Sequence, residues 1–511
     1  MRPTIDKRRT HREGAMKSRM LPCITAATLL FTAMAMPNGM EAQAVQNQST
    51  EHVRYKLIDL GTFGGPNSYV NGPSVPDFSS QGTYVGDADT STLDPDGGYC
   101  GPPNCFVQHT QKWKNGVVTD LGALLGATNN SGSIWISQNG RFISGFSENG
   151  VTDPLLGVPE MRAVLWTEDG KIIDLGTMGG GNESFGTGVN SRGQVMGTAT
   201  NTITDPYSMF CLYFCATTET RSFLWQDGVK VDLGTLGGPD ANAYAINERG
   251  QITGYSYTNY APNSTTGVPT ADPFFWDKGK MMDIGTLGGT YGNPLGINSS
   301  GQVVGVSDMA GDQTSHPFFW DREKGIKDLG TFGGSNGTAF GINDSGLVVG
   351  TTDYPGDSIH RAFVWKNGVK TDLGFLPGEP CNSGHAINSR GQVVGPSRNC
   401  MGVTAHLFLW ENGVMQNLNA LILPGSDLQL VNAWGISDNG EIAAVGVLPN
   451  GDEHAVLLVP ATAADIAEAS AFTASSPALS VLLPPAVTSV KSSFGGRNKA
   501  INRFRGAQLE Q

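Results

Sequence analysis

Short runs of apolar, β-forming residues alternate with tight turns along most of the chain. Between residues 54 and 460 no stretch of useful length keeps a helical period. The stretch AYAINERGQITG at residues 243–254 is typical, because two β-rich runs flank a turn with Asn before it and Gly closing it. An Asn side chain can cap its own backbone in such a turn, and Gly accepts a positive φ. The pattern predicts short antiparallel strands joined by hairpins.

Three signals recur in a fixed order and divide the chain into units. They are Asp-Leu-Gly or a near match, a turn followed by a short apolar run (as in NSSGQVVG), and an apolar-aromatic run that ends in Trp. The first signal begins at Asp59, Asp120, Asp174, Asp232, Asp283, Asp328, Asp372 and Asn417. The Trp stands at Trp113, Trp166, Trp225, Trp276, Trp320, Trp365 and Trp410, and Leu458 replaces it in the last copy. Successive first signals lie 44 to 61 residues apart, a period typical of solenoids, propellers and arrays.

The two ends of the repeat favour a closed ring. Each full unit contains four antiparallel strands, as one β-propeller blade requires. The first strand, Tyr55–Gly61, lacks a partner before it, and the last, His454–Pro460, lacks an Asp-Leu-Gly strand after it. Side by side they complete an eighth blade and leave no open sheet edge, whereas a linear solenoid would need polar caps instead.

We therefore predict an all-β protein, a β-propeller of eight four-stranded blades closed by the N- and C-terminal strands, with seven blades as the alternative. The first unit is the weakest, because Pro76 interrupts its expected inner strand. We expect the repeated Trp to pack between blades and the Asp of Asp-Leu-Gly to cap a turn or bind backbone amides. The GTLGG loops should let the chain cross to the next blade, and since no helix N-terminus follows them, we expect no nucleotide site.

The phrases DLGTLGG and IN..GQVVG and the His-x-Phe-x-Trp pattern resemble the HAF-repeat family of extracellular repeat proteins. The His-Ala-Phe triplet of that family has its nearest forms at His360, His406 and His454, with frequent departures, and the resemblance covers Tyr55–Pro460. It implies a bacterial, exported repeat protein. It carries no catalytic residue to this sequence.

Composition agrees with many strands joined by tight turns. Gly makes up 69 of 511 residues, charged residues 15% and hydrophobic residues 39%, which favours neither long helices nor wholesale disorder. Residues 45–460 hold 21 basic and 40 acidic side chains, a net charge of −19. Such an acidic body repels phosphate backbones, so we expect no nucleic-acid partner.

The termini differ from the repeat. In residues 1–44, basic side chains precede the apolar run LPCITAATLLFTAMAMP and a small-residue site at Ala42–Ala44, a pattern typical of a cleaved export signal. A short linker (45–53), the propeller (54–460) and an Ala/Ser/Pro-rich, disordered tail with a basic end (461–511) should follow. We expect a monomer that is secreted, periplasmic or on the cell surface, with no membrane span after signal cleavage.

Six cysteines remain once Cys23 is removed with the signal, and an even number in an exported chain suggests disulfides. The expected pairs are local: Cys100 with Cys105, Cys211 with Cys215, and Cys381 with Cys400. Free thiols or another pairing are the alternatives. Four carboxylates, Asp87, Asp89, Asp94 and Asp96, form a weak calcium candidate without the spacing of an EF-hand loop, and a solvated acidic loop is the favoured interpretation. No other cofactor is expected.

Functional residues should lie on the face that carries the longer connections and at the mouth of the central channel, because binding residues usually sit on loops held by a rigid scaffold. The sequence contains no HExxH motif and no GxSxG nucleophile elbow, since such an elbow requires a helix after the serine. We expect a non-enzymatic binding or scaffold module for glycan or protein. The alternatives are an extracellular hydrolase or lyase that acts on polysaccharide with carboxylates at the channel mouth, and a purely structural envelope or matrix component.

Overall fold

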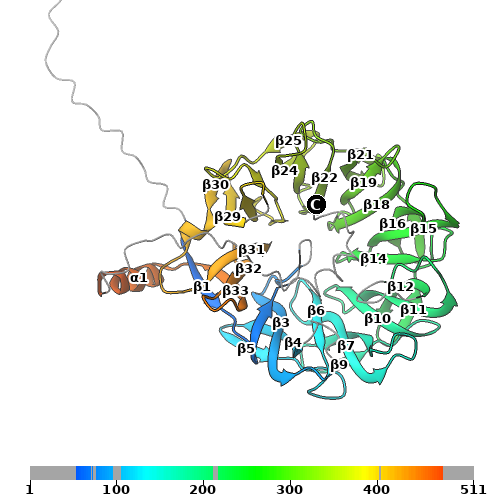
Figure 1. Ribbon diagram of the computed structural model, residues 1–511, viewed down its shortest axis with the longest axis horizontal. Helices are drawn as coiled ribbons and strands as arrows, with labels where there is room; N and C mark the ends of the chain where they lie inside the picture. The colour runs from blue at the N-terminus through cyan, green and yellow to red at the C-terminus, as the bar shows by residue number, and fades with distance from the viewer. Residues whose placement is uncertain are drawn as a thin grey trace, which may run out of the picture. The chain divides into compact units, whose positions relative to one another are not determined.

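Strands form nearly all of the regular structure in the described residues, which are 53–70, 72, 76–95, 105–210, 217–401 and 404–475 of the computed structural model. These residues belong to one unit, His52–Gln511. Its sheets follow one another around a ring, with β6, β10, β14 and β18 on the inner side and β5, β21, β25 and β30 on the outer side (Figure 1). The propeller prediction is confirmed. The predicted export signal lies outside the described residues.

Hydrogen bonding divides the described strands into eight four-stranded units. The first four comprise β2 (Gly64–Tyr69), β3 (Thr83–Leu93), β4 (Phe106–Lys114), β5 (Val117–Asp120); β6 (Ser131–Ile136), β7 (Phe142–Thr152), β8 (Pro159–Thr167), β9 (Ile172–Asp174); β10 (Gly180–Val189), β11 (Val195–Thr204), β12 (Thr218–Gln226), β13 (Val229–Asp232); and β14 (Ala241–Ile246), β15 (Ile252–Pro262), β16 (Pro269–Asp277), β17 (Lys280–Asp283). A single parallel bridge, Ala271 with Tyr291, joins the fourth unit to the fifth.

The remaining units follow the same order. They comprise β18 (Gly288–Ile297), β19 (Val303–Met309), β20 (Ser315–Asp321), β21 (Gly325–Asp328); β22 (Gly337–Ile342), β23 (Val348–Asp353), β24 (His360–Lys366), β25 (Val369–Asp372); β26 (Cys381–Asn382), β27 (Ala386–Ile387), β28 (Val393–Arg398), β29 (Thr404–Glu411), β30 (Val414–Asn417); and β31 (Gln429–Ile436), β32 (Ile442–Val447), β33 (Glu453–Pro460) with β1 (Tyr55–Asp59). In the seventh unit the inner strand is broken into β26 and β27, and a 3-10 helix, η1 (Leu418–Leu421), follows β30.

The N-terminal strand closes the ring as expected. β1 pairs antiparallel with β33, with Leu57 opposite Leu458, and completes the sheet β1-β33-β32-β31. The His454 Nδ1 lies 2.8 Å from an oxygen of the Asp59 carboxylate across this pair. The same contact joins His316 and Asp328 within the fifth unit, at 2.9 Å. The His of the third signal thus binds the Asp of the next Asp-Leu-Gly, and the closing sheet uses the contact found inside an ordinary unit.

The Asn of the NSSGQVVG turn links neighbouring units. The Asn298 Oδ1 accepts from the Ser300 and Gln302 amides at 3.1 and 3.0 Å, and its Nδ2 donates to the Gln302 Oε1 at 2.8 Å. The same Nδ2 donates to the Asn343 carbonyl of the next unit at 3.2 Å. Equivalent links join Asn190 to Asn247, Asn247 to Asn298, Asn343 to Asn388 and Asn388 to Ser437. A belt of side-chain to backbone bonds therefore runs across six consecutive units.

The other repeated residues have the expected structural roles. The Asp232 Oδ1 accepts from the Gly234 amide at 2.8 Å and caps the Asp-Leu-Gly turn. The Trp320 ring packs on Phe275 of the preceding unit, with 5.1 Å between ring centroids. Apolar clusters accordingly join adjacent blades, as where Phe319 of the fifth unit packs with Phe363 of the sixth.

The first unit agrees with its prediction, and the tail does not. β2 ends at Tyr69, and after Pro76 only the bridge between Phe78 and Tyr84 continues this pairing in the described residues, so the first unit is indeed irregular. The expectation of a disordered tail is wrong for α1 (Ala463–Ser475). Thr462 and Asp465 cap this Ala-rich helix reciprocally, and Lys56 of β1 forms a 2.9 Å ion pair with Asp465. Among the described helices, none has the length and apolar character that crossing a bilayer requires.

Candidate functional site

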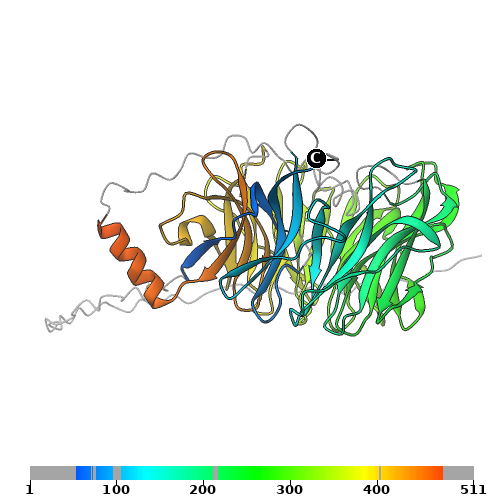
Figure 2. The same ribbon diagram turned by 90° about the horizontal axis from the view of Figure 1, so that it is seen from below.

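The antiparallel order of each unit separates two kinds of connection. Short turns join its first strand to its second and its third to its fourth, and they lie on one face of the ring. The crossings to the next unit and the hairpins between second and third strands lie on the opposite face, which we call the hairpin face; Figure 2 shows the ring edge-on. The hairpin face is the one on which the sequence predicts binding.

The hairpins of the first four units are longer than the others. The second strands β3, β7, β11 and β15 have 11, 11, 10 and 11 residues, whereas β19, β23, β28 and β32 have 7, 6, 6 and 6. β3, β7, β11 and β15 follow one another along one arc of the ring (Figure 1). The hairpin face is therefore asymmetric, with four long hairpins side by side.

Each long hairpin exposes apolar side chains near its tip. Leu93, Leu155, Ile203 and Tyr260 are 60%, 69%, 56% and 66% exposed, one from each hairpin in turn. Val151 and Val268 are also exposed on the second and fourth hairpins. We call these six residues the ridge. Exposed apolar side chains gathered on adjacent loops are typical of an interaction surface.

A repeated turn shapes the upper part of these hairpins. Asn149, Asn201 and Asn259 each accept, through Oδ1, a 2.9 Å hydrogen bond from the backbone amide two residues later. The strand pairing breaks its register at the same point in each hairpin. This Asx turn ties the backbone locally and so frees it from the ladder. Val151 and Ile203 of the ridge directly follow two of these turns.

The base of each long hairpin contacts the next blade at an equivalent position, which we number junction 1 to junction 4. A residue at the hairpin tip meets a residue at or near the start of the next inner strand. The pairs are Asp94 and Asn130, Asp153 and Glu183, and Asp205 and Asp240, and in the fourth hairpin Ala271 of the returning strand forms a bridge with Tyr291. In junctions 1 to 3 the second residue also accepts a backbone amide from the hairpin's returning strand, at 2.8, 2.9 and 2.8 Å.

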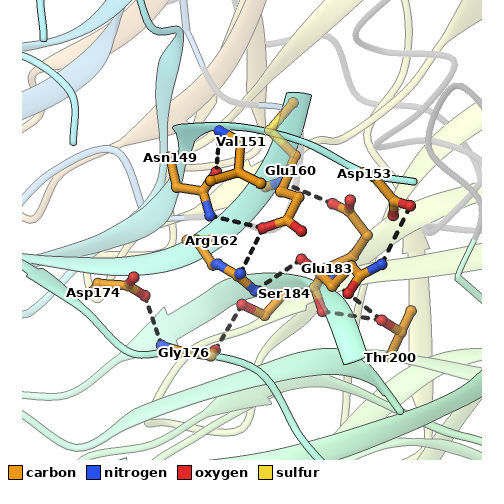
Figure 3. A network of polar contacts seen from close by, with 12 residues as sticks. Asn149, Val151, Asp153, Glu160, Arg162, Asp174, Gly176, Glu183, Ser184 and Thr200 are labelled. Atoms are coloured by element: carbon orange, nitrogen blue, oxygen red, sulfur yellow. Dashed lines mark hydrogen bonds and ion pairs between the residues drawn. The ribbon is translucent and has the colours of Figure 1, made fainter. Parts of the chain in front are cut away.

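Junction 2 lies in a dense polar network (Figure 3). The Glu183 carboxylate accepts the Met161 amide at 2.9 Å, and its side chain hydrogen-bonds to Asp153. The Asp153 Oδ1 accepts the Leu155 amide at 2.6 Å and the Asn182 side-chain amide at 3.3 Å. Close by, the Glu160 Oε2 pairs with Arg162 at 2.6 Å. The network fixes the tip that presents Leu155.

The acids of junctions 2 and 3 are buried. Asp153, Glu183, Asp205 and Asp240 are at most 4% exposed. Burial, together with the neighbouring Asp153 and Glu160, raises the pKa of Glu183 to about 9, although its bond from the Met161 amide opposes the rise. Burial and then the Asp205 carboxylate raise the pKa of Asp240 to about 8, against bonds from the Thr220 and Met209 amides. Both shifts favour a proton shared within each pair.

The predicted calcium candidates are not brought together. The Asp87 Oδ1 accepts the Ser133 amide at 2.8 Å, the Asp89 Oδ1 accepts from Gln108 at 2.9 Å, and the Asp94 Oδ2 accepts from Asn130 at 3.0 Å. Within the described part of the chain no group of three or more His, Cys, Asp or Glu residues is arranged to hold a metal ion. Asp96 lies outside that part, and calcium binding stays a prediction.

Of the three predicted disulfides, the one between two described cysteines is confirmed. Cys381 and Cys400 are bonded, with their Cα atoms 5.1 Å apart, and tie β26 to the hairpin of the seventh unit. Cys105 is disulfide-bonded, and its predicted partner Cys100 lies outside the described residues. Cys211 and Cys215 also lie outside them, so their pairing stays a prediction.

A second set of variable side chains lies on the inner strands. Most inner strands carry a β-bulge at one position, which the break between β26 and β27 replaces in the seventh unit. The side chains there are Ile134, Thr187, Tyr244, Leu295, Phe340, His385 and Trp434. The His385 ring stacks on Trp434 at 4.6 Å and meets the Phe340 ring edge-on at 5.7 Å. Burial lowers the pKa of His385 to about 3, so its neutral ring donates through Nδ1 to the Ala433 carbonyl.

Sequence reasoning singled out Asp94 only as a calcium candidate and did not single out the other junction acids. A signal was present, since Asp94, Asp153 and Asp205 each precede Pro directly after the second strand of their unit. The alternative hydrolase would need two accessible carboxylates. The paired carboxylates of junctions 2 and 3 are instead buried and bound to backbone amides.

No family model and no curated protein matches this chain. Among solved structures, TolB from Acinetobacter baumannii aligns at 10% identity over 62% of this chain and 63% of its own, with a TM-score of 0.29. Dipeptidyl peptidase 4 from Porphyromonas gingivalis aligns at 8% identity over 72% of this chain and 56% of its own, at 0.35. A gluconolactonase from Xanthomonas campestris aligns at 10% over 66% and 91%, at 0.25. This chain thus spans less than two thirds of the first two, and at such scores the propeller assignment depends on the strand pairing described above.

Proposed function

We propose that this chain is an exported, non-enzymatic propeller that binds a protein along the ridge. The observation that carries the proposal is the asymmetry of the hairpin face, where four adjacent units of eight have long hairpins and each exposes an apolar side chain. Folding alone does not require these extensions, because the other four units form the same sheets without them.

The chemistry of the ridge favours a protein over a glycan. Five of its six side chains are aliphatic, and Tyr260 is the only aromatic among them. Sugar rings stack on flat aromatic faces, whereas aliphatic side chains complement the apolar centre of a protein interface.

The negative charge of the long hairpins indicates which kind of protein surface would bind there. The long hairpins and their flanks, residues 87–109, 146–162, 199–221 and 256–272, contain ten acidic and two basic side chains, a net charge of −8. A partner surface with an apolar centre and Lys or Arg around it would complement this region, and the opposite charge would speed its association.

A phage-displayed random-peptide library, selected on the purified protein, tests the proposal. We expect enriched peptides to combine aliphatic with basic residues and to lose at least about tenfold in affinity when Leu155→Asp and Ile203→Asp place charge in the ridge. Val414→Asp, at an exposed position on β30 away from the ridge, is the matched control and should bind normally.

Three outcomes would overturn the proposal. Peptide binding that tolerates both ridge substitutions would remove the ridge as the binding surface. Selective signals on a glycan array, unchanged by the same substitutions, would favour the glycan alternative. Turnover of an array glycan by the wild-type protein would favour the enzyme.

A further inference from the structure

Junctions 1 to 3 use one geometry with two kinds of chemistry. In junction 1 the neutral Asn130 donates its Nδ2 to the Asp94 Oδ2 at 3.0 Å while its Oδ1 accepts the Gln108 amide. An amide can donate and accept at the same time. Glu183 occupies the Asn130 position in junction 2, and there the same pair of bonds requires a protonated carboxyl group. In junction 3 both Asp240 oxygens accept backbone amides, from Thr220 and Met209, so its contact with Asp205 requires a proton shared between the two acids.

In junction 2 the surroundings leave no other donor for this contact. The Glu183 Oε1 is buried and receives no hydrogen bond from any other group in the described residues. Two ionised carboxylates in contact within a buried junction would repel each other without compensation. The proton that each pair holds is thus part of the contact between hairpin and blade.

We propose that one shared proton in each of junctions 2 and 3 fastens the second and third long hairpins to the following blades, so that rising pH loosens the ridge. The inference builds on the proposed function only in its consequence for partner binding. The fastening itself concerns this chain alone.

The charged groups around each junction do not replace the proton. Glu183 faces Asp153 and Glu160 from the hairpin, and Arg162 is already paired with Glu160 at 2.6 Å. Asp240 faces Asp205 from its hairpin and Tyr255 and Tyr257 from β15. The nearby Arg221 forms a 2.9 Å ion pair with Asp232. Both cations therefore already have carboxylate partners.

The sign of the pH effect follows from proton linkage. In an opened hairpin the acids return to ordinary pKa values of about 4, whereas in the closed junctions the pKa values are about 9 for Glu183 and about 8 for Asp240. The closed state thus binds more protons between these limits. Closure is strongest below the ordinary values, and opening becomes about tenfold more favourable with each pH unit up to the closed-state value, where the effect levels off.

Hydrogen–deuterium exchange across pH 5 to pH 9 tests this fastening. The Leu155 and Met161 amides report on junction 2, because they donate to Asp153 and Glu183. The Tyr207 and Thr220 amides report on junction 3 in the same way. In the wild-type protein we expect their protection factors, corrected for intrinsic exchange, to fall by about tenfold per pH unit up to the plateau.

Two substitutions test junctions 2 and 3 individually. Glu183→Gln keeps the shape of the side chain and supplies a permanent donor, as Asn130 does. It should flatten the pH profile of junction 2 and leave that of junction 3 sloping. Asp205→Asn should do the reverse, because both Asp240 oxygens accept backbone amides, whereas only one Asp205 oxygen does. Glu168→Gln, which removes a carboxylate that is 59% exposed, should change neither profile. The Ala362 amide donates to Asn382 of the next blade at 2.8 Å, where no acid pair is present. Its protection factor should therefore not change with pH.

The proposal fails if the wild-type protection factors do not change with pH, or if Glu183→Gln keeps the wild-type pH dependence in junction 2. It also fails if the protection factor of the Ala362 amide falls equally with pH, since an equal fall would indicate global loosening. None of these measurements uses a partner. Failure here would therefore leave the peptide-binding result standing, and peptide binding that ignores the ridge would leave the exchange result standing.

Discussion

At the scale of single residues, the repeated phrases are explained by contacts that only certain side chains can make. The Gly305 that ends QVVG pairs opposite Pro294 beside the bulge of the inner strand, and a Cβ added there would overlap the Asn293 carbonyl. Equivalent overlaps occur at Gly145, Gly197, Gly254, Gly350 and Gly395. The glycine is therefore required by the close approach of two strands.

Gly305→Ala should lower the free energy of unfolding by about 3 kcal/mol or more, because neither backbone can move without disturbing the sheet. Gly296→Ala is the matched control on the facing strand, where the nearest atom to an added Cβ lies at 3.4 Å, and it should change stability by less than about 1 kcal/mol. Urea denaturation of the three proteins measures both values. Equal effects would show that the bulge carbonyl does not require this glycine.

At the scale of elements, the seventh blade departs most from the repeat. Its inner strand is divided into β26 and β27, and the Cys381–Cys400 disulfide ties the first piece to the hairpin beyond β28. β26 and β27 each pair only two residues with β28, so this hydrogen bonding stabilises the inner strand little. The covalent link therefore replaces pairing that an unbroken inner strand would supply.

Replacing Cys381→Ala together with Cys400→Ser should destabilise the protein by about 3 kcal/mol, the loop-entropy value for a closed loop of about 20 residues. Thermal denaturation of the folded proteins measures the loss. Under a thiol reductant the difference between wild type and variant should disappear. A difference that persists would point to side-chain packing as its cause.

At the scale of the whole molecule, closure by β1 decides whether eight sheets behave as one structure. β1 lies between the edge of β33 and the chain at Ile422, and the Leu423 amide donates to the Tyr55 carbonyl at 2.8 Å. The Lys56–Asp465 ion pair adds a contact from α1. The residues of β1 thus form hydrogen bonds with residues that lie almost four hundred positions later in the sequence.

Deleting residues 54–61 should remove most of the folding stability, which is about 5–15 kcal/mol for a typical domain. The exposed edge of β33 should also promote aggregation. Thermal denaturation and size-exclusion chromatography measure the two effects, with a chain that begins at residue 45 as the control. Recovery on adding a peptide of residues 54–61 would identify the missing strand as the cause. An unchanged melting temperature would refute closure as a source of stability.

The sequence was sufficient for the ring but not for the junctions. The strands, their closure and the interblade Trp follow from local patterns that recur, because each copy provides a check on the others. The partners of Asp153 and Asp205 lie 30 and 35 positions further along the chain, in the next unit, so only the packing of neighbouring blades brings them together. The helix α1 was also missed, although its capping residues Thr462 and Asp465 lie close together in the sequence; only its contact with Lys56 comes from the other end of the propeller.

The inner-strand bulges have a consequence for protein design. At each bulge one residue stands outside the ladder, so its identity is not set by a partner across the sheet. Seven different amino acids already occupy these places in one scaffold. A designer could therefore vary these positions without changing the strand pairing, provided that Phe340, His385 and Trp434, whose rings are in contact, are changed together.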